Sequence, residues 1–193
     1  MEKARTNDQF SSGLTARTGS GEKALACGRY YAECRDKDGN LKWTAEGDNL
    51  VVNAGLQYMA GTALVSTAQI TTWYVGLYGA AASNTPAASD TMASGGHPGW
   101  TEIDCYSDAT RPAATFAAAT NANPSVVTNT SNKAVFNIDA TATVGGAFLV
   151  SNNTILGTTG TLFSAADFQS PGDRSVVSGD VISVTYEFRL TAT

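Results

Sequence analysis

The sequence predicts an all-β protein with one short helix: an antiparallel two-sheet sandwich or a jelly-roll-like barrel with a flexible N-terminal arm. Within the last strand, residues 180–191, apolar and polar residues alternate from Ile182 to Thr191, which is typical of a strand with one buried face. Other short apolar stretches recur between turn residues, and no repeating strand–helix unit appears. The composition, 42% hydrophobic but only 15% charged, favours strands and polar loops over helices.

The length of the chain bounds its domain organisation. A chain of 193 residues is long enough to bury a core without a disulfide or a metal, which suggests one domain. We assign residues 25–193 to a single sandwich or jelly-roll domain. Residues 1–24 are too polar to order themselves, because Phe10 and Leu14 are their only large apolar side chains apart from Met1. We therefore expect residues 1–24 to form the flexible arm.

A hairpin is expected near the start of this domain. Its strands are Arg29–Arg35 and Leu41–Thr44. Asp36–Asn40 form the turn, in which Gly39 suits a positive φ. The turn also resembles the start of a calcium loop, but the twelfth position of that loop is Gly47, where a bidentate Glu is required. The hairpin is therefore favoured over a calcium site.

One substantial helix is predicted. It runs from Leu50 to about Ala63, because Asn49 can cap its start. Gly55 and Gly61 weaken it, so it needs packing to persist. Its apolar face has helical spacing and carries Val52, Leu56, Met59 and Ala63.

The remaining strands are read from apolar patterns and turn residues. We expect a strand that is apolar on both faces at Trp73–Tyr78. A long loop of small residues, 80–99, separates it from a strand at Trp100–Tyr106. An alternating strand at Lys133–Val144 is broken by Gly145–Gly146, as at a bulge or a sharp bend. Further segments expected in strands or in the core are Arg111–Ala119, Ala147–Val150 and Leu162–Phe168.

Few residues offer catalytic chemistry. His97 is the one histidine, and its Gly- and Pro-rich loop lacks the packing that fixes a catalytic base. Glu102 and Asp104 lie two apart on an expected strand, where charge on an exposed face explains them better than a catalytic carboxylate pair. No cluster has metal-ligand spacing, and no phosphate-binding loop occurs. We expect neither an enzyme nor a cofactor, and we assign no catalytic, cofactor-binding or metal-binding residue.

Charge and hydropathy restrict the possible partners. The net charge is -5 and no basic stripe with interleaved aromatic residues occurs, so nucleic-acid binding is disfavoured. No apolar stretch approaches the length that crosses a bilayer, so no membrane partner is expected. The first residues are polar and unlike a signal peptide, and the three cysteines lack metal spacing, which suits a reducing cytoplasm.

Several motifs together resemble virion proteins of tailed bacteriophages. The opening of the domain resembles many of these proteins, through Asp38–Trp43 and Asn49–Leu56. Later motifs resemble one group among them, the capsid decoration or cement proteins of jelly-roll type. These motifs are His97–Glu102, Tyr106, Arg111–Ala113, Val144–Leu149, and Gly179–Asp180 with the closing strand. The resemblance covers about residues 28–193, and its motifs are structural rather than catalytic.

The resemblance implies a structural role in the virion. The protein would be made in the host cytoplasm and would lie on the capsid exterior, where many copies bridge neighbouring major capsid protein subunits. Binding only the assembled, expanded shell stabilises that state by mass action. Cement proteins often assemble as dimers or trimers, so a homo-oligomer is expected. The resemblance implies no cofactor.

The arm is the segment that we expect to bind a partner. Phe10 and Leu14 are its apolar anchors, and Arg5 and Arg17 carry guanidinium groups beside them. This combination suits an acidic groove on the capsid or a neighbouring copy of the chain. A passive tail without a role is the alternative.

A second class of function stays open at this point. The chain would then be a phage tail-fibre module or a carbohydrate-binding sandwich with an aromatic stacking platform. The residues of that platform are Trp73, Tyr74, Trp100 and Tyr106, although their apolar strands favour places in the core. The number of copies per virion separates the two classes, because a shell protein is present in hundreds and a tail protein in far fewer.

Overall fold

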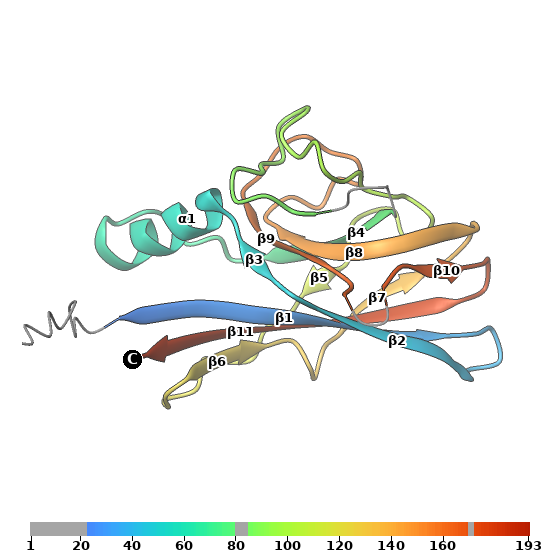
Figure 1. Ribbon diagram of the computed structural model, residues 1–193, viewed down its shortest axis with the longest axis horizontal. Helices are drawn as coiled ribbons and strands as arrows, with labels where there is room; N and C mark the ends of the chain where they lie inside the picture. The colour runs from blue at the N-terminus through green and yellow to red at the C-terminus, as the bar shows by residue number, and fades with distance from the viewer. Residues whose placement is uncertain (1–22, 80–84, 170–171) are drawn as a thin grey trace, which may run out of the picture.

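The computed structural model describes residues 23–79, 85–169 and 172–193. Two antiparallel sheets pack face to face beside one helix in this part of the chain, so the predicted all-β sandwich is confirmed (Figure 1). The β11 sheet consists of β2 (Leu41–Asp48), β1 (Ala24–Arg35), β11 (Val181–Ala192) and β6 (Ser125–Thr128), with β7 (Ala134–Asn137) also paired to β11. The β8 sheet consists of β3 (Leu50–Val51), β9 (Leu162–Asp167), β8 (Ala142–Val150), β4 (Trp73–Gly79) and β5 (Ala113–Ala114), with β10 (Arg174–Val176) also paired to β8.

The first and last strands form the long axis of the β11 sheet. β1 pairs with β11 in one unbroken antiparallel register, from Ala24 opposite Ala192 to Arg35 opposite Val181. Lys23 and Thr193 extend the pairing, because each backbone N–H donates to the carbonyl of the other at 2.8 Å. β1 therefore begins five residues before the predicted Arg29. The small and apolar residues at its start, Ala24–Gly28, join the sheet because β11 offers them backbone partners along its whole length.

The main core lies between the two sheets. Tyr30, Ile182 and Val184 reach it from the β11 sheet, and Leu77 and Ala147 reach it from the β8 sheet; all five are fully buried. The alternation predicted for the last strand is thus confirmed over the part of β11 that faces the β8 sheet. Burying apolar side chains of this size stabilises the fold by about 1.5–3 kcal/mol each.

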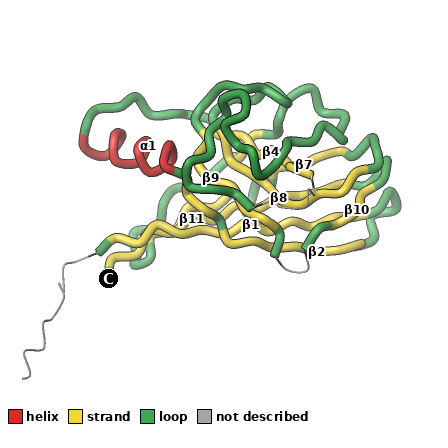
Figure 2. The backbone as a smooth tube through the Cα atoms, turned by 45° about the horizontal axis from the view of Figure 1, so that its top comes forward, coloured by secondary structure: helices red, strands yellow, loops and turns green. Residues whose placement is uncertain are grey.

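The β8 sheet is buried on its second face as well. Figure 2 shows loops covering this sheet on the side away from the β11 sheet. Trp100 enters from one of these loops, and its ring lies 5.2 Å from that of Tyr78 and 4.9 Å from that of Phe148. The prediction that residues 73–78 form a strand with two apolar faces is confirmed.

The helix differs from its prediction. α1 spans Asn53–Leu64, and the residue before it, Val52, makes no side-chain capping hydrogen bond. Leu50 and Val51 pair with β9 instead, so Asn49 precedes a strand and is not a cap. The predicted apolar face is confirmed only in part: Met59 packs against the core, whereas Leu56 is 46% exposed and Ala63 is exposed. α1 also contacts the sandwich through Tyr58 and through Gly55, where an added Cβ would lie 2.2 Å from the Phe163 carbonyl oxygen.

Three predicted strands also need correction. Residues 100–106 form only isolated bridges, between Glu102 and Tyr78 and between Tyr106 and Ile138. Residues 111–119 contain only the short strand β5. The stretch 133–144 is interrupted at 138–141, where Ile138 and Asp139 donate to the carbonyls of Asp180 and Cys105. The irregularity predicted at Gly145–Gly146 is also present, because Tyr78 lies opposite Gly146 and Gly79 lies opposite Val144, so the β4–β8 register shifts there. β8 continues through the two glycines. Gly146 has no room for a side chain, because an added Cβ would lie 2.2 Å from the Ala166 carbonyl oxygen.

Candidate functional site

An apolar groove opens at the end of the sandwich where β1 begins and β11 finishes. The inner face of β11 there lies opposite α1 (Figure 1), and it carries Phe188, which is half-buried, and Leu190, which is 43% exposed. The groove encloses a cavity volume of about 990 Å³. We call it the end groove and define it by Tyr58, Met59, Phe116, Val127, Phe188 and Leu190 at its walls, with Trp73 and Phe163 at its floor.

The aromatic residues of the end groove hold one another in place. The Trp73 ring lies 5.3 Å from that of Tyr58 and 5.4 Å from that of Phe163, in edge-to-face arrangements. Phe188 lies 5.4 Å from Phe163 in the same manner. The Tyr58 hydroxyl accepts a hydrogen bond of 2.8 Å from the backbone N–H of Ile70, which fixes the loop after α1 against the groove. Such contacts give the groove a preformed shape.

The lining of the end groove carries no charged side chain among the described residues. Its polar members are mainly threonines, and its large members are aromatic or aliphatic. An apolar side chain gains free energy by entering such a groove, whereas a charged group would lose its hydration. The groove is therefore suited to receive apolar side chains.

A buried hydrogen-bond network links the groove to both sheets. The Tyr186 hydroxyl accepts a bond of 2.7 Å from the Asn49 side-chain amide and one of 3.3 Å from the Ser164 hydroxyl. Ser164 is also 2.8 Å from the Tyr30 hydroxyl. Burial raises the pKa of Tyr30 and of Tyr186 well above the usual value, so both hydroxyls stay protonated. Their role is to connect the sheets.

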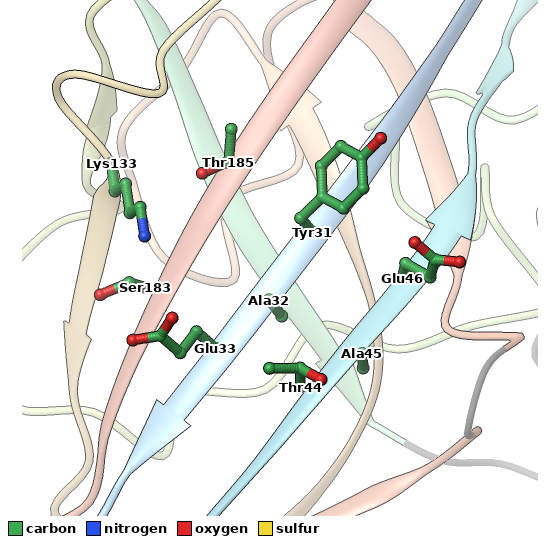
Figure 3. A pocket seen from close by; sticks show the side chains of 9 residues that line it. All are labelled: Tyr31, Ala32, Glu33, Thr44, Ala45, Glu46, Lys133, Ser183 and Thr185. Atoms are coloured by element: carbon green, nitrogen blue, oxygen red, sulfur yellow. The ribbon is translucent and has the colours of Figure 1, made fainter. Parts of the chain in front are cut away.

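A second, polar hollow lies on the outer face of the β11 sheet (Figure 3). It has a cavity volume of about 510 Å³. The polar side chains that line it are those of Tyr31, Glu33, Thr44, Glu46, Lys133, Ser183 and Thr185. Each carboxylate has a cation beside it: Glu33 lies 2.7 Å from Arg35 and Glu46 lies 3.5 Å from Arg29. Figure 3 shows the Tyr31 ring between the side chains of Thr185 and Glu46. The two carboxylates are thus compensated, and the hollow also presents hydroxyl groups and the Lys133 ammonium group.

His97 is held as part of the packing of a loop. Its ring stacks on Trp100 with centroids 4.0 Å apart, and Nδ1 lies 2.9 Å from the Trp100 carbonyl oxygen. Trp100 Nε1 in turn donates to Asp90 at 2.8 Å. No hydrogen bond in the described residues joins His97 to a serine, cysteine or carboxylate side chain. The arrangement gives His97 a packing partner that the sequence did not indicate.

Glu102 and Asp104 do not share an exposed face. Glu102 is buried and bound to Arg111, whereas Asp104 is exposed. The prediction of an exposed Glu102 is therefore wrong. Its carboxylate is compensated inside the protein by a guanidinium group, which is how a buried charge is retained. Sequence reasoning took Arg111 for the edge of a strand and missed this partner.

The aromatic residues proposed for a stacking platform do not form one. Trp100 and Tyr106 are buried, at 2% and 4% exposure. Trp73 and Tyr74 follow each other in β4 and pack on opposite faces of the β8 sheet. The core placement that their apolar strands favoured is the one observed.

The described residues include the predicted turn of the first hairpin. The turn 36–40 forms as predicted, with Gly39 at φ 83° and the Asp36 carboxylate accepting from the N–H groups of Asp38 and Asn40 at 2.9 Å. No group of three or more potential metal ligands occurs in residues 23–79, 85–169 and 172–193. No helix within these ranges is long and apolar enough to cross a membrane.

The partner-binding residues expected in the arm, Arg5, Phe10, Leu14 and Arg17, lie outside the described residues.

Comparison of the chain with protein-family models, with curated proteins and with solved structures found no match. No single stretch of the sequence predicts the end groove, because its walls come from four separate segments. The alternation of Phe188 and Leu190 beyond the covered part of β11 was the one signal that pointed to it.

Proposed function

We propose that this protein is a structural component of a tailed-phage virion, which decorates the capsid exterior and bridges major capsid protein subunits. The observation that carries the proposal is the end groove. It leaves preformed apolar surface open beside the start of β1, where the N-terminal segment joins the domain. An apolar surface of this kind is typical of a protein that completes its packing against another protein.

The resemblance to decoration proteins supports the proposal through residues that build the fold. Arg111 and Glu102 tie two loops together, and Gly146 allows β8 to pack against Tyr78. These residues belong to the motifs on which the resemblance rests. A rigid domain built in this way stabilises a shell by linkage, because it binds the assembled state and not the free subunits.

Sedimentation with empty shells tests this proposal. Purified protein is mixed with expanded shells that lack it, and separately with free major capsid protein. We expect saturable binding to the shells, in hundreds of copies each, and a higher temperature of shell disruption. Protein that stays in the supernatant at every ratio would contradict the proposal.

A second candidate function is a carbohydrate-binding module of a tail fibre, which the polar hollow favours. Tyr31 is 38% exposed there among hydroxyl and carboxylate side chains, a combination that suits a sugar ring. Binding of host surface polysaccharide, measured by calorimetry, tests it. We expect Tyr31→Ala to abolish such binding if this function holds and Leu41→Ala, outside the hollow, to leave it unchanged.

A further inference from the structure

We propose that the end groove is the docking site of this chain's own N-terminal segment, residues 1–22, with Phe10 and Leu14 seated among its aromatic side chains. The inference concerns the free protein and does not depend on the proposed function: in the free protein the segment covers the groove, and on a shell a capsid partner would displace it. It assigns the two apolar anchors to the chain's own domain and leaves Arg5 and Arg17 available to a partner.

The end groove needs a cover of limited size and apolar character. Its volume, about 990 Å³, is at the upper end of the range for pockets that enclose a whole ligand. Its walls hold Phe188 and Leu190 on the inner face of a sheet, a face that elsewhere in this protein is buried by the opposite sheet. Two large apolar side chains on a short peptide meet this need.

The geometry places the N-terminal segment at the entrance of the groove. Ala26 is paired with Leu190, and Lys23 bonds to Thr193 at the very end of the sheet. Figure 1 shows the start of β1 and the C-terminus on the same side of the molecule as α1. The Asn123 side chain forms hydrogen bonds of 3.0 and 3.1 Å with the backbone of Ala192. These bonds fix the end of β11 at the entrance of the groove. The segment therefore leaves the sheet beside Leu190.

The length and sequence of the segment allow it to turn back. Residues 15–22 separate Leu14 from Lys23, and a stretch of this length spans up to about 28 Å when extended. Gly19 and Gly21 permit the reversal, since glycine adopts backbone conformations closed to other residues. Phe10 precedes Leu14 by four residues, so both anchors enter the groove from one short stretch.

The tether favours the segment over other apolar occupants. A peptide joined to its site by a short linker has an effective concentration in the millimolar range, far above that of a second copy in dilute solution. The absence of charge from the described groove lining directs Phe10 and Leu14 inward and keeps the guanidinium groups of Arg5 and Arg17 at the rim. Both arguments select docking within one chain.

Dye binding by the free protein provides the first test. We compare the full chain, a chain that begins at Lys23, the double variant Phe10→Ser/Leu14→Ser, and the matched control Arg5→Ser/Arg17→Ser. A dye that fluoresces on apolar surface should bind the shortened chain and the Phe10/Leu14 variant several-fold more strongly than the full chain, and the control should match the full chain. Equal dye fluorescence in all four proteins would overturn the inference.

Cross-linking provides the second test and locates the contact. Phe10 is replaced by the photo-reactive analogue p-benzoylphenylalanine, and an equal mixture of light-isotope and heavy-isotope protein is irradiated. We expect cross-links from position 10 to Tyr58, Met59 or Phe116 within one chain. Cross-links between light and heavy chains, or none to the end groove, would overturn the inference. Neither test uses shells, so failure here leaves the virion proposal intact, and failure of shell binding leaves this inference intact.

Discussion

Glu102 and Arg111 form a buried ion pair that joins two loops on the outer side of the β8 sheet. Arg111 Nε donates to one carboxylate oxygen at 2.7 Å and Nη2 to the other at 2.6 Å. The same guanidinium donates to the carbonyl of Asn152 at 2.8 Å, and Glu102 accepts from the N–H of Leu156 at 2.8 Å. The pair therefore holds segments that are more than forty residues apart in sequence.

Breaking this pair should be severe. Glu102→Ala leaves a guanidinium buried without its counter-charge, and we expect a loss of about 3–5 kcal/mol in the free energy of unfolding. Glu46→Ala removes an exposed ion pair with Arg29 and serves as the control, with an expected loss below about 1 kcal/mol. Urea denaturation measures both. A Glu102→Ala protein as stable as the control would contradict the account of the pair.

The two phenylalanines Phe136 and Phe188 should differ in their contribution to stability. Phe136 is fully buried, so Phe136→Ala should leave a cavity and cost about 3–5 kcal/mol. Phe188 is only half-buried at the end groove, so Phe188→Ala should cost about 1–2 kcal/mol, less than its place in the alternation suggested. Val135→Ala, at an exposed position beside Phe136, is the control. Equal losses for the two phenylalanine variants, measured by urea denaturation, would show that the groove end is as enclosed as the core.

Gly146 and Gly39 should respond differently to alanine. A Cβ at Gly146 would meet the Ala166 carbonyl oxygen and the Tyr78 ring at 2.2 Å, so Gly146→Ala must displace β9 or Tyr78. Gly39 has φ 83° and open space around it, so Gly39→Ala costs only the backbone strain of about 1–2 kcal/mol. We expect Gly39→Ala to fold with a slightly lower Tm and Gly146→Ala to be the less stable by far. The reverse order in thermal melting would contradict the described packing of β8.

Asp167 should make stability depend on pH. Burial, and then the negative charge of Asp173, raises the pKa of Asp167 above its usual 3.8. The folded state thus holds this proton more tightly than the unfolded state, so its contribution to stability is fully present below pH 3.8 and is lost as the pH rises through the raised pKa. We expect Asp167→Asn to raise the Tm at neutral pH and to lose this advantage below pH 3.8. A Tm difference that does not change with pH would contradict this assignment.

The sequence predicted those elements whose signal is local. The alternation in β11 and the apolar stretch of β4 each follow from the two faces of a strand, and the turn at Gly39 follows from its backbone. Asn49 was misread, and the continuation of β8 through Gly145–Gly146 was missed, because the surroundings of these residues are supplied by distant parts of the chain. Asn49 bonds to Tyr186, and Gly146 is enclosed by Tyr78 and Ala166. Local propensity carries no information about such neighbours.

The candidate sites were less predictable than the fold for the same reason. The end groove combines residues of α1, β4, β6, β9 and β11 with the loops 67–72 and 115–119. The partner of Glu102 is Arg111, which sequence alone places near a strand edge. Only Phe188 and Leu190, apolar residues that continue the β11 alternation beyond the covered core, marked the groove in the sequence.

Electron microscopy of shells with and without this protein tests the central claim, attachment to a capsid exterior, most directly. Shells saturated with the full chain should show added density on the outer surface, repeated at equivalent positions where major capsid protein subunits meet. The same shells incubated with buffer should lack that density. Added density confined to a tail or a portal, or no added density at saturation, would contradict the proposed function.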